Sequence, residues 1–111
     1  MLYMSTEELH LDQVTELAEI FGLLADPTRL SIVIACMDQE RCAGEIAEKL
    51  GTSASLTSHH LRLLRSARIL KSERRGKHVF YMMADACVHS VLKIMIEHIF
   101  NHSHDAVDEP Q

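Results

Sequence analysis

The sequence predicts a mainly α-helical domain that also contains one small β-hairpin, an α+β fold. Apolar residues recur at spacings of three and four along most of the chain, the pattern of helices that bury one face. Residues 69–72 and 78–83 instead resemble two short strands, and Gly76 between them suits a hairpin turn. The chain has 111 residues, of which 47% are hydrophobic, enough for one core. We therefore expect one domain over residues 1–102 and a flexible C-terminal tail over residues 103–111.

The first two helices are separated by a strong helix-start signal. Apolar positions predict a first helix over about residues 9–24. Asp26 suits the cap of a second helix and Pro27 its first turn, and this helix should continue to about Met37. Cys36 lies in the apolar run of the second helix, which favours a place in the core over a reactive thiol.

A third and a fourth helix follow, joined by a short turn. The third is predicted over residues 43–50, because Gly51 is a typical residue for ending a helix. Thr52 and Ser53 then cap a fourth helix that runs to about Ala67. Two helices joined by a turn of about four residues form a helix-turn-helix, in which the second helix is the recognition helix.

The fourth helix divides into an apolar stripe and a polar face. The stripe consists of Leu56, Leu61, Leu63 and Leu64. The polar face contains no carboxylate and consists of Ser55, Thr57, Ser58, His59, His60, Arg62 and Arg65. Short polar side chains allow close approach to the DNA major groove, while Arg neutralises phosphate or reads guanine. We therefore expect these seven residues to bind double-stranded DNA.

The hairpin that follows carries a basic tip. Arg74, Arg75 and Lys77 flank or form its turn, where their charges would meet backbone phosphate. A helix-turn-helix followed by a basic hairpin is a winged helix-turn-helix. The predicted order is four helices, two strands and a final helix.

The charge distribution supports a local rather than a general contact with DNA. The whole chain is acidic, with 11 Lys and Arg against 16 Asp and Glu. Residues 52–83 nevertheless hold seven basic residues and a single acid, Glu73. A basic block within an acidic protein is typical of a localised DNA-binding surface, although a solvated basic helix face is the alternative.

The sequence lacks the signals of membrane proteins, secreted proteins and enzymes. No apolar run approaches the roughly 20 residues that span a bilayer, and the N-terminus does not resemble a signal peptide. Cys36, Cys42 and Cys87 are dispersed and suggest no disulfide framework. No HExxH motif or nucleophile elbow is present. We therefore expect a cytoplasmic protein without enzymatic activity.

The final helix, predicted over about residues 86–101, is apolar over more than half of its circumference. Its apolar residues are Val88, Val91, Leu92, Ile94, Met95, Ile96, Ile99 and Phe100. A small domain covers only one face of such a helix, so the remainder predicts a second copy of the chain. A homodimer would present two recognition helices to a palindromic operator.

Four stretches together resemble one family. These are DPTRL at 26–30, RCAGEIAEKLGTSAS at 41–55, TSHHLRLLRSARIL at 57–70 and RRGKHVFY at 74–81. They resemble the ArsR/SmtB family of bacterial winged-helix repressors over about residues 10–102. The resemblance implies a dimer formed by the first and last helices. It also implies release from DNA by a metal ion held between the two copies of the last helix.

The resemblance further implies which residues hold the metal. The family's zinc pattern is Asp-x-His, ten residues, and then His-x-x-Glu or His-x-x-His. Here Asp85 and His98 match, Cys87 replaces the first His, and Asn101 occupies the last position with His102 one place later. The implied inducer site is therefore Asp85, Cys87, His98 and His102, which suits Zn(II) or a similar divalent transition metal.

Helix geometry bears on this ligand set. At about 100° per residue, Cys87 and His98 share a face, whereas His89 lies roughly opposite His98. Asp85 and His98 are separated along a helix by about 20 Å, so one copy cannot close the site. Antiparallel pairing of two copies would bring the two ends together. The alternative is that these are polar residues of an interface.

Other effectors remain open. In relatives that sense thiophilic metals, a Cys-x-Cys pair falls near Cys42, but Gly44 replaces the second thiol here. This difference disfavours arsenic(III) and lead. A repressor that responds to thiol redox state or persulfidation through Cys36, Cys42 or Cys87, or to no ligand, is the alternative function.

Overall fold

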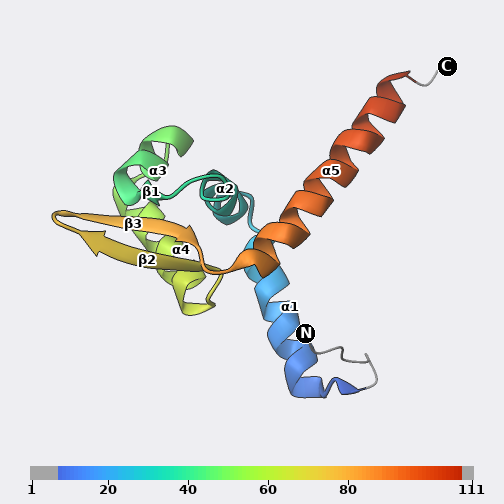
Figure 1. Ribbon diagram of the computed structural model, residues 1–111, viewed down its shortest axis with the longest axis horizontal. Helices are drawn as coiled ribbons and strands as arrows, with labels where there is room; N and C mark the ends of the chain where they lie inside the picture. The colour runs from blue at the N-terminus through green and yellow to red at the C-terminus, as the bar shows by residue number, and fades with distance from the viewer. Residues whose placement is uncertain (1–7, 109–111) are drawn as a thin grey trace.

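Five helices and a three-stranded sheet make up the described part of the computed structural model, residues 8–108, with side chains described for residues 8–103 (Figure 1). The helices are α1 (Leu11–Leu24), α2 (Pro27–Ala35), α3 (Ala43–Leu50), α4 (Ala54–Ser66) and α5 (Ala86–Asp108). The strands are β1 (Arg41–Cys42), β2 (Leu70–Arg75) and β3 (His78–Met83). The predicted winged helix-turn-helix order is confirmed, with β1 as an addition.

Short-range signals set the helix ends within the head, by which we mean α2–α4 together with the sheet. Asp26 caps α2 by accepting a backbone N–H at 2.9 Å, and Pro27 opens the helix. Gly51 ends α3 in the left-handed conformation, with φ 66°, which costs glycine little. Ser53 caps α4 by accepting a backbone N–H at 3.0 Å. These four predicted signals are confirmed.

The core lies between α2, α3, α4 and the base of the hairpin. Its most completely buried side chains are Ile32, Val33, Ile46, Leu61, Leu64, Ile69 and Leu70. Cys36 belongs to the same cluster and is 2% exposed. Burial raises the pKa of its thiol to about 11, so Cys36 is a core residue, as predicted.

The sheet is antiparallel in the order β1-β3-β2, and the long β2–β3 pair forms the wing. The sequence did not predict β1, which is only two residues long and pairs Arg41 with Tyr81. β2 continues to Arg75, three residues beyond the predicted strand, because it pairs with β3 as far as His78. Gly76 opens the turn with φ 63°.

α1 and α5 extend away from the head in different directions and meet where α5 begins (Figure 1). The sequence placed the end of α5 near Asn101, but the helix continues to Asp108, into the segment that was assigned to a tail. Residues 109–111 of that segment lie outside the described residues. Although α5 has 23 residues, no helix in the described range is apolar enough over a sufficient length to cross a membrane.

The burial of α4 gives a stability prediction. Replacing Leu64, which is 0% exposed, with Ala should lower the free energy of unfolding by about 2–5 kcal/mol, because it removes apolar contacts and leaves a cavity. Leu56→Ala on the same helix is the matched control, since Leu56 is 44% exposed. Urea unfolding at one protein concentration would measure both values. An equal loss in the two variants would contradict the packing described.

Candidate nucleic-acid interface

The exposed face of α4 holds most of the predicted DNA-contact residues. Five of the seven are exposed: Ser55, Ser58, His59, Arg62 and Arg65. The short side chains occupy the N-terminal half of the helix and the two guanidinium groups follow. Arg65 donates to Ser72 Oγ at 3.3 Å, which holds its side chain toward β2. Small polar groups at the start of the helix and cations after them suit insertion into a major groove.

Two predicted contact residues lie in the interior instead. Thr57 is 1% exposed, and its Oγ1 lies 2.7 Å from Thr52 Oγ1, so its hydroxyl is already hydrogen-bonded. His60 is 7% exposed, and its Nδ1 lies 3.5 Å from Arg29 Nη1. Neither side chain is therefore available to contact DNA. The predicted apolar stripe was correspondingly wrong at Leu56, which faces solvent.

Burial also changes the protonation of His60. It lowers the pKa of the imidazole from its ordinary value of 6.5, and the charge of Arg29 lowers it further. The Asp26 carboxylate opposes these effects, and it stays charged because accepting the Arg29 backbone N–H lowers its own pKa. The net shift of the His60 pKa is still downward, so His60 is neutral at pH 7. The sequence did not identify Arg29 as a partner of His60, because the two residues come together only in the folded chain.

The three wing cations are not equivalent. Arg75 forms ion pairs with Glu40 and Glu73, and its guanidinium lies 5.0 Å from the centre of the Phe80 ring. The hydrogen bond from Arg75 lowers the pKa of Glu40, and the two carboxylates raise the pKa of Arg75. Arg74 and Lys77 are exposed, and neither forms an ion pair among the described side chains. They are the wing charges best placed to meet phosphate.

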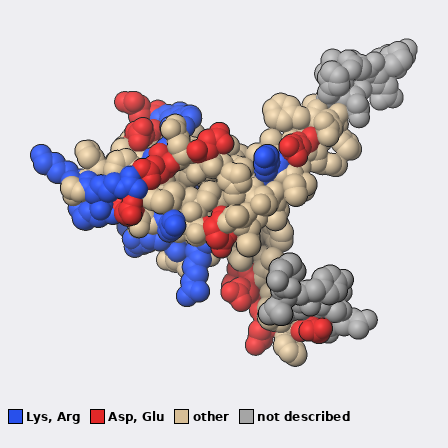
Figure 2. All heavy atoms as spheres, viewed as in Figure 1, with Lys and Arg blue, Asp and Glu red and all other residues tan. Residues whose placement is uncertain are grey.

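Basic side chains gather over one part of the surface. On the face shown in Figure 2, Lys and Arg lie over the wing and the adjoining side of the head, with Asp and Glu beside them on the head and further acidic side chains along α1. The acidic helix would disfavour DNA contact away from this region.

The four predicted metal ligands fall into two separate pairs. At the start of α5, Asp85 accepts the Cys87 backbone N–H at 2.9 Å, so it caps the helix, and Cys87 is exposed. Near the other end, the rings of His98 and His102 lie 4.1 Å apart. Within the described part of one chain, no three His, Cys, Asp or Glu residues come together as a metal site. The ligand set stays a prediction, since its two pairs lie toward opposite ends of α5.

The helices that carry these ligands also present a large apolar surface. A groove of about 580 Å³ runs between α1 and α5 and is lined almost wholly by apolar side chains. Along it, Phe21 is 55% and Ile99 59% exposed, and beyond it Phe100 is 70% exposed. Monomeric proteins seldom leave so continuous an apolar surface in water.

Comparison with known proteins agrees with this architecture. Residues 26–72 match the sequence model described as "Bacterial regulatory protein, arsR family". The chain is 40% identical over 93 residues to a transcriptional repressor SmtB homolog of Synechocystis, covering 84% of this chain and 70% of that one. It is 33% identical over 91 residues to a cadmium resistance transcriptional regulatory protein CadC homolog of Staphylococcus aureus, covering 81% and 72% respectively.

Among solved structures, the homodimeric winged helix-turn-helix DNA-binding domain of Mycobacterium bovis Mb0332 superposes with a TM-score of 0.77. This match covers 100% of both chains at 21% identity, which supports the fold alone. The family match and the two sequence relatives carry the assignment. The chain belongs to the ArsR/SmtB family of DNA-binding, winged helix-turn-helix transcriptional regulators.

Proposed function

We propose that the protein is a homodimeric transcriptional repressor that binds a palindromic operator and is released by a divalent transition metal. The observation that carries this proposal is the separation of two surfaces. A polar and basic surface covers α4 and the wing, and an apolar one lines the facing sides of α1 and α5. The first suits DNA and the second suits another copy of the chain.

The DNA-binding part of the proposal rests on α4 and the wing. Ser55, Ser58 and His59 are exposed at the start of α4, where short side chains can approach base edges. Arg62 and Arg65 follow on the same helix, and Arg74 and Lys77 extend the positive charge to the wing. Phosphate contacts would position α4 along the DNA, while contacts from the start of α4 to base edges would determine which DNA sequence is bound.

The dimer rests on the apolar surface of α1 and α5. Burying exposed side chains such as Phe21, Met95 and Ile99 against a second copy would remove them from water, which favours association by roughly 25 cal/mol per Å² of apolar area. Twofold symmetry then supplies two recognition helices for two half-sites. The Mycobacterium bovis domain of the same fold is described as homodimeric, which supports this assembly.

The effector rests on the two ligand pairs of α5. If the α5 helices of two copies pair antiparallel, Asp85 and Cys87 of one copy approach His98 and His102 of the other. This set of one carboxylate, one thiol and two imidazoles fits Zn(II) or a similar borderline ion. A bound metal would tie the two helices together. A relative is named for cadmium resistance, which supports a metal effector of this class.

The thiol-based alternative receives less support from the cysteines. Cys36 is buried and its raised pKa keeps the thiol protonated, which makes it a poor nucleophile. Cys42 is half-buried at the start of α3, and Cys87 is the exposed one of the three. A metal site at Cys87 uses the accessible thiol and needs no reaction at Cys36.

Release would follow from linkage between metal and DNA. Metal that holds the α5 helices in one arrangement weakens DNA binding only if that arrangement misplaces the two α4 helices. The same coupling must then weaken metal binding when DNA is bound, typically by about 5–150-fold. The residues of this chain would contribute the ligands, the helix cap at Asp85 and the apolar groove between α1 and α5 that a second copy would fill.

The first prediction concerns DNA. An operator duplex can be obtained by selection from a random-sequence pool with the wild-type protein. Arg74→Ala/Lys77→Ala should weaken its binding and reduce the salt slope by about one unit per lost phosphate contact. Lys93→Ala on α5 is the matched control for loss of a cation. Ser58→Ala should instead change the preferred sequence. Wild-type affinity and salt slope in the double variant would rule out the wing contact.

The second prediction concerns assembly. The wild-type chain should sediment at about twice 12.6 kDa without metal or DNA. Met95→Glu/Ile99→Glu should shift it toward the monomer, because two carboxylates would be buried in the interface without partners. Glu97→Gln, at an exposed position of the same helix, should leave the dimer intact. A wild-type monomer at micromolar concentration would remove both the palindrome and the shared site.

The third prediction concerns the metal. His98→Ala should lose metal-induced release while apo operator binding persists, whereas His89→Ala, on the opposite side of α5, should retain release. Co(II) absorption in the wild-type protein should show a thiolate band that Cys87→Ser removes.

A heterodimer tests whether two copies share the site. One chain would carry Asp85→Asn/Cys87→Ser, in which Asn can still cap α5, and the other His98→Ala/His102→Ala. This heterodimer should bind one metal ion where the wild type binds two. If each site lies within one copy, both are broken and no metal is bound.

A further inference from the structure

One side chain connects three helices of the protein. Arg29, in the first turn of α2, donates from Nε to the Leu23 carbonyl at 2.9 Å, near the end of α1. Its Nη1 lies 3.5 Å from His60 Nδ1 on α4. Its backbone N–H is held by Asp26, the cap of α2. Arg29 therefore links the helix of the apolar surface to the helix of the DNA-contact surface.

The link fixes the protonation of His60. A guanidinium group has donors and no acceptor, so His60 Nδ1 must be the unprotonated nitrogen of a neutral ring. Protonation would place two donors and two positive charges against each other. The charged and titratable groups that influence His60 are Arg29, Asp26 and its neighbour His59.

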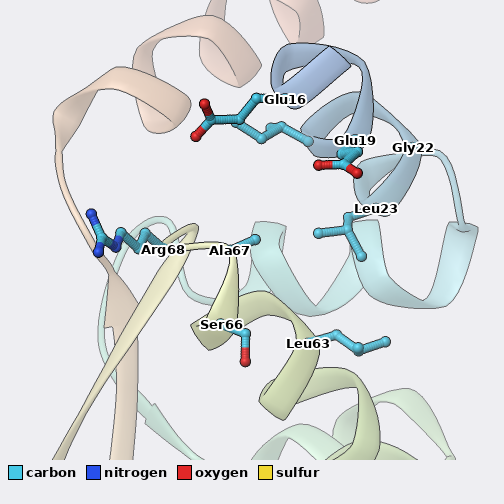
Figure 3. A pocket seen from close by; sticks show the side chains of 9 residues that line it. Glu16, Glu19, Gly22, Leu23, Leu63, Ser66, Ala67 and Arg68 are labelled. Carbon is cyan, nitrogen blue, oxygen red and sulfur yellow. The ribbon is translucent and has the colours of Figure 1, made fainter. Parts of the chain in front are cut away.

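Away from Arg29, a groove lies between α1 and α4. It has a volume of about 750 Å³ and separates α1 from the C-terminal half of α4. Figure 3 shows Glu16, Glu19 and Leu23 of α1 on one side and Leu63, Ser66 and Ala67 on the other. Because these helices do not pack tightly along the groove, a change in their angle need not break apolar packing there.

We propose that Arg29 is a positioning residue that sets the orientation of α4 relative to α1 through neutral His60, and that protonation of His60 releases α4. This inference rests on the proposed function, since it matters only if α1 belongs to a dimer and α4 binds DNA. It identifies a connection within each subunit that acts on the DNA-contact surface without touching DNA.

The sign of the pH dependence follows from the burial of His60. Its pKa in the folded protein lies below the ordinary value of 6.5. The link is therefore intact above that value and is lost as the pH falls through the lowered pKa. Exposed His59 belongs to the proposed DNA-contact surface, so the pH dependence is measured in variants that lack its imidazole.

The experiment compares two variants on the selected operator duplex. In His59→Asn, affinity should fall at least about fivefold, the lower end of typical coupling, as the pH is lowered from about 8 through the His60 pKa that NMR measures. In His59→Asn/His60→Asn, that fall should disappear, because Asn places an acceptor near the Nδ1 position and does not titrate. Adding Arg29→Met to His59→Asn should also abolish it. The same pH dependence in all three variants would overturn the proposal.

A second measurement needs no DNA. NMR of the wild-type dimer should show the His60 ring neutral with its proton on Nε2. In Arg29→Met, the His60 pKa should rise, because the nearby positive charge is removed, while thermal unfolding reports whether the variant is folded. An unchanged His60 pKa in a folded variant would refute the link. Absence of any selected DNA sequence for the wild type would instead refute the proposed function, so the two failures are distinguishable.

Discussion

The rotation of α4 about its own axis is the constraint on which the DNA-contact surface depends. Thr57, Leu61 and Leu64 are buried at spacings of four and three, so they fix one face of the helix against the core. Once this face is inside, Ser58 and Arg62 necessarily lie outside. The apolar core, more than the polar residues themselves, therefore selects which side chains can meet DNA. Leu56 is exposed for the same reason, since it is rotated by about 100° around the helix from buried Thr57.

The fold could be predicted largely because its signals are local. Asp26 and Ser53 each accept a hydrogen bond from the backbone N–H three residues further along the chain. Gly51 adopts a left-handed backbone conformation that residues with a Cβ seldom adopt. Such signals act within one turn and are visible in the sequence. β1 was missed because two residues are too few to show an alternating pattern, and it is defined only by its pairing with β3.

The candidate site was less predictable, because the residues that depart from the predicted DNA-contact set contact partners far away in the sequence. His60 is buried beside Arg29, 31 residues away, and Arg75 is engaged by Glu40, 35 residues away. A sequence pattern treats such polar residues as solvent-facing because it contains no record of the partner. The proposed α5 ligands are limited in another way: one chain brings His98 and His102 together but leaves them apart from Asp85 and Cys87. In the proposed dimer, the second copy would supply the missing half of each site.

The magnitude of the Arg29 contacts bears on how a change at α5 could reach DNA. A hydrogen bond to a charged group contributes about 1.5–3 kcal/mol, and coupling between two sites is typically about 1–3 kcal/mol. One such connection per subunit is therefore of the right size to bias the orientation of α4. In the proposed dimer, a second copy that fills the apolar groove between α1 and α5 would transmit a rearrangement of α5 to α1, and Arg29 would transmit it from the end of α1 to α4. A purely apolar contact between α1 and α4 would resist any change of angle, whereas a polar link such as the one through Arg29 has two states, made and broken. Two discrete states of one element are what coupling between distant sites requires.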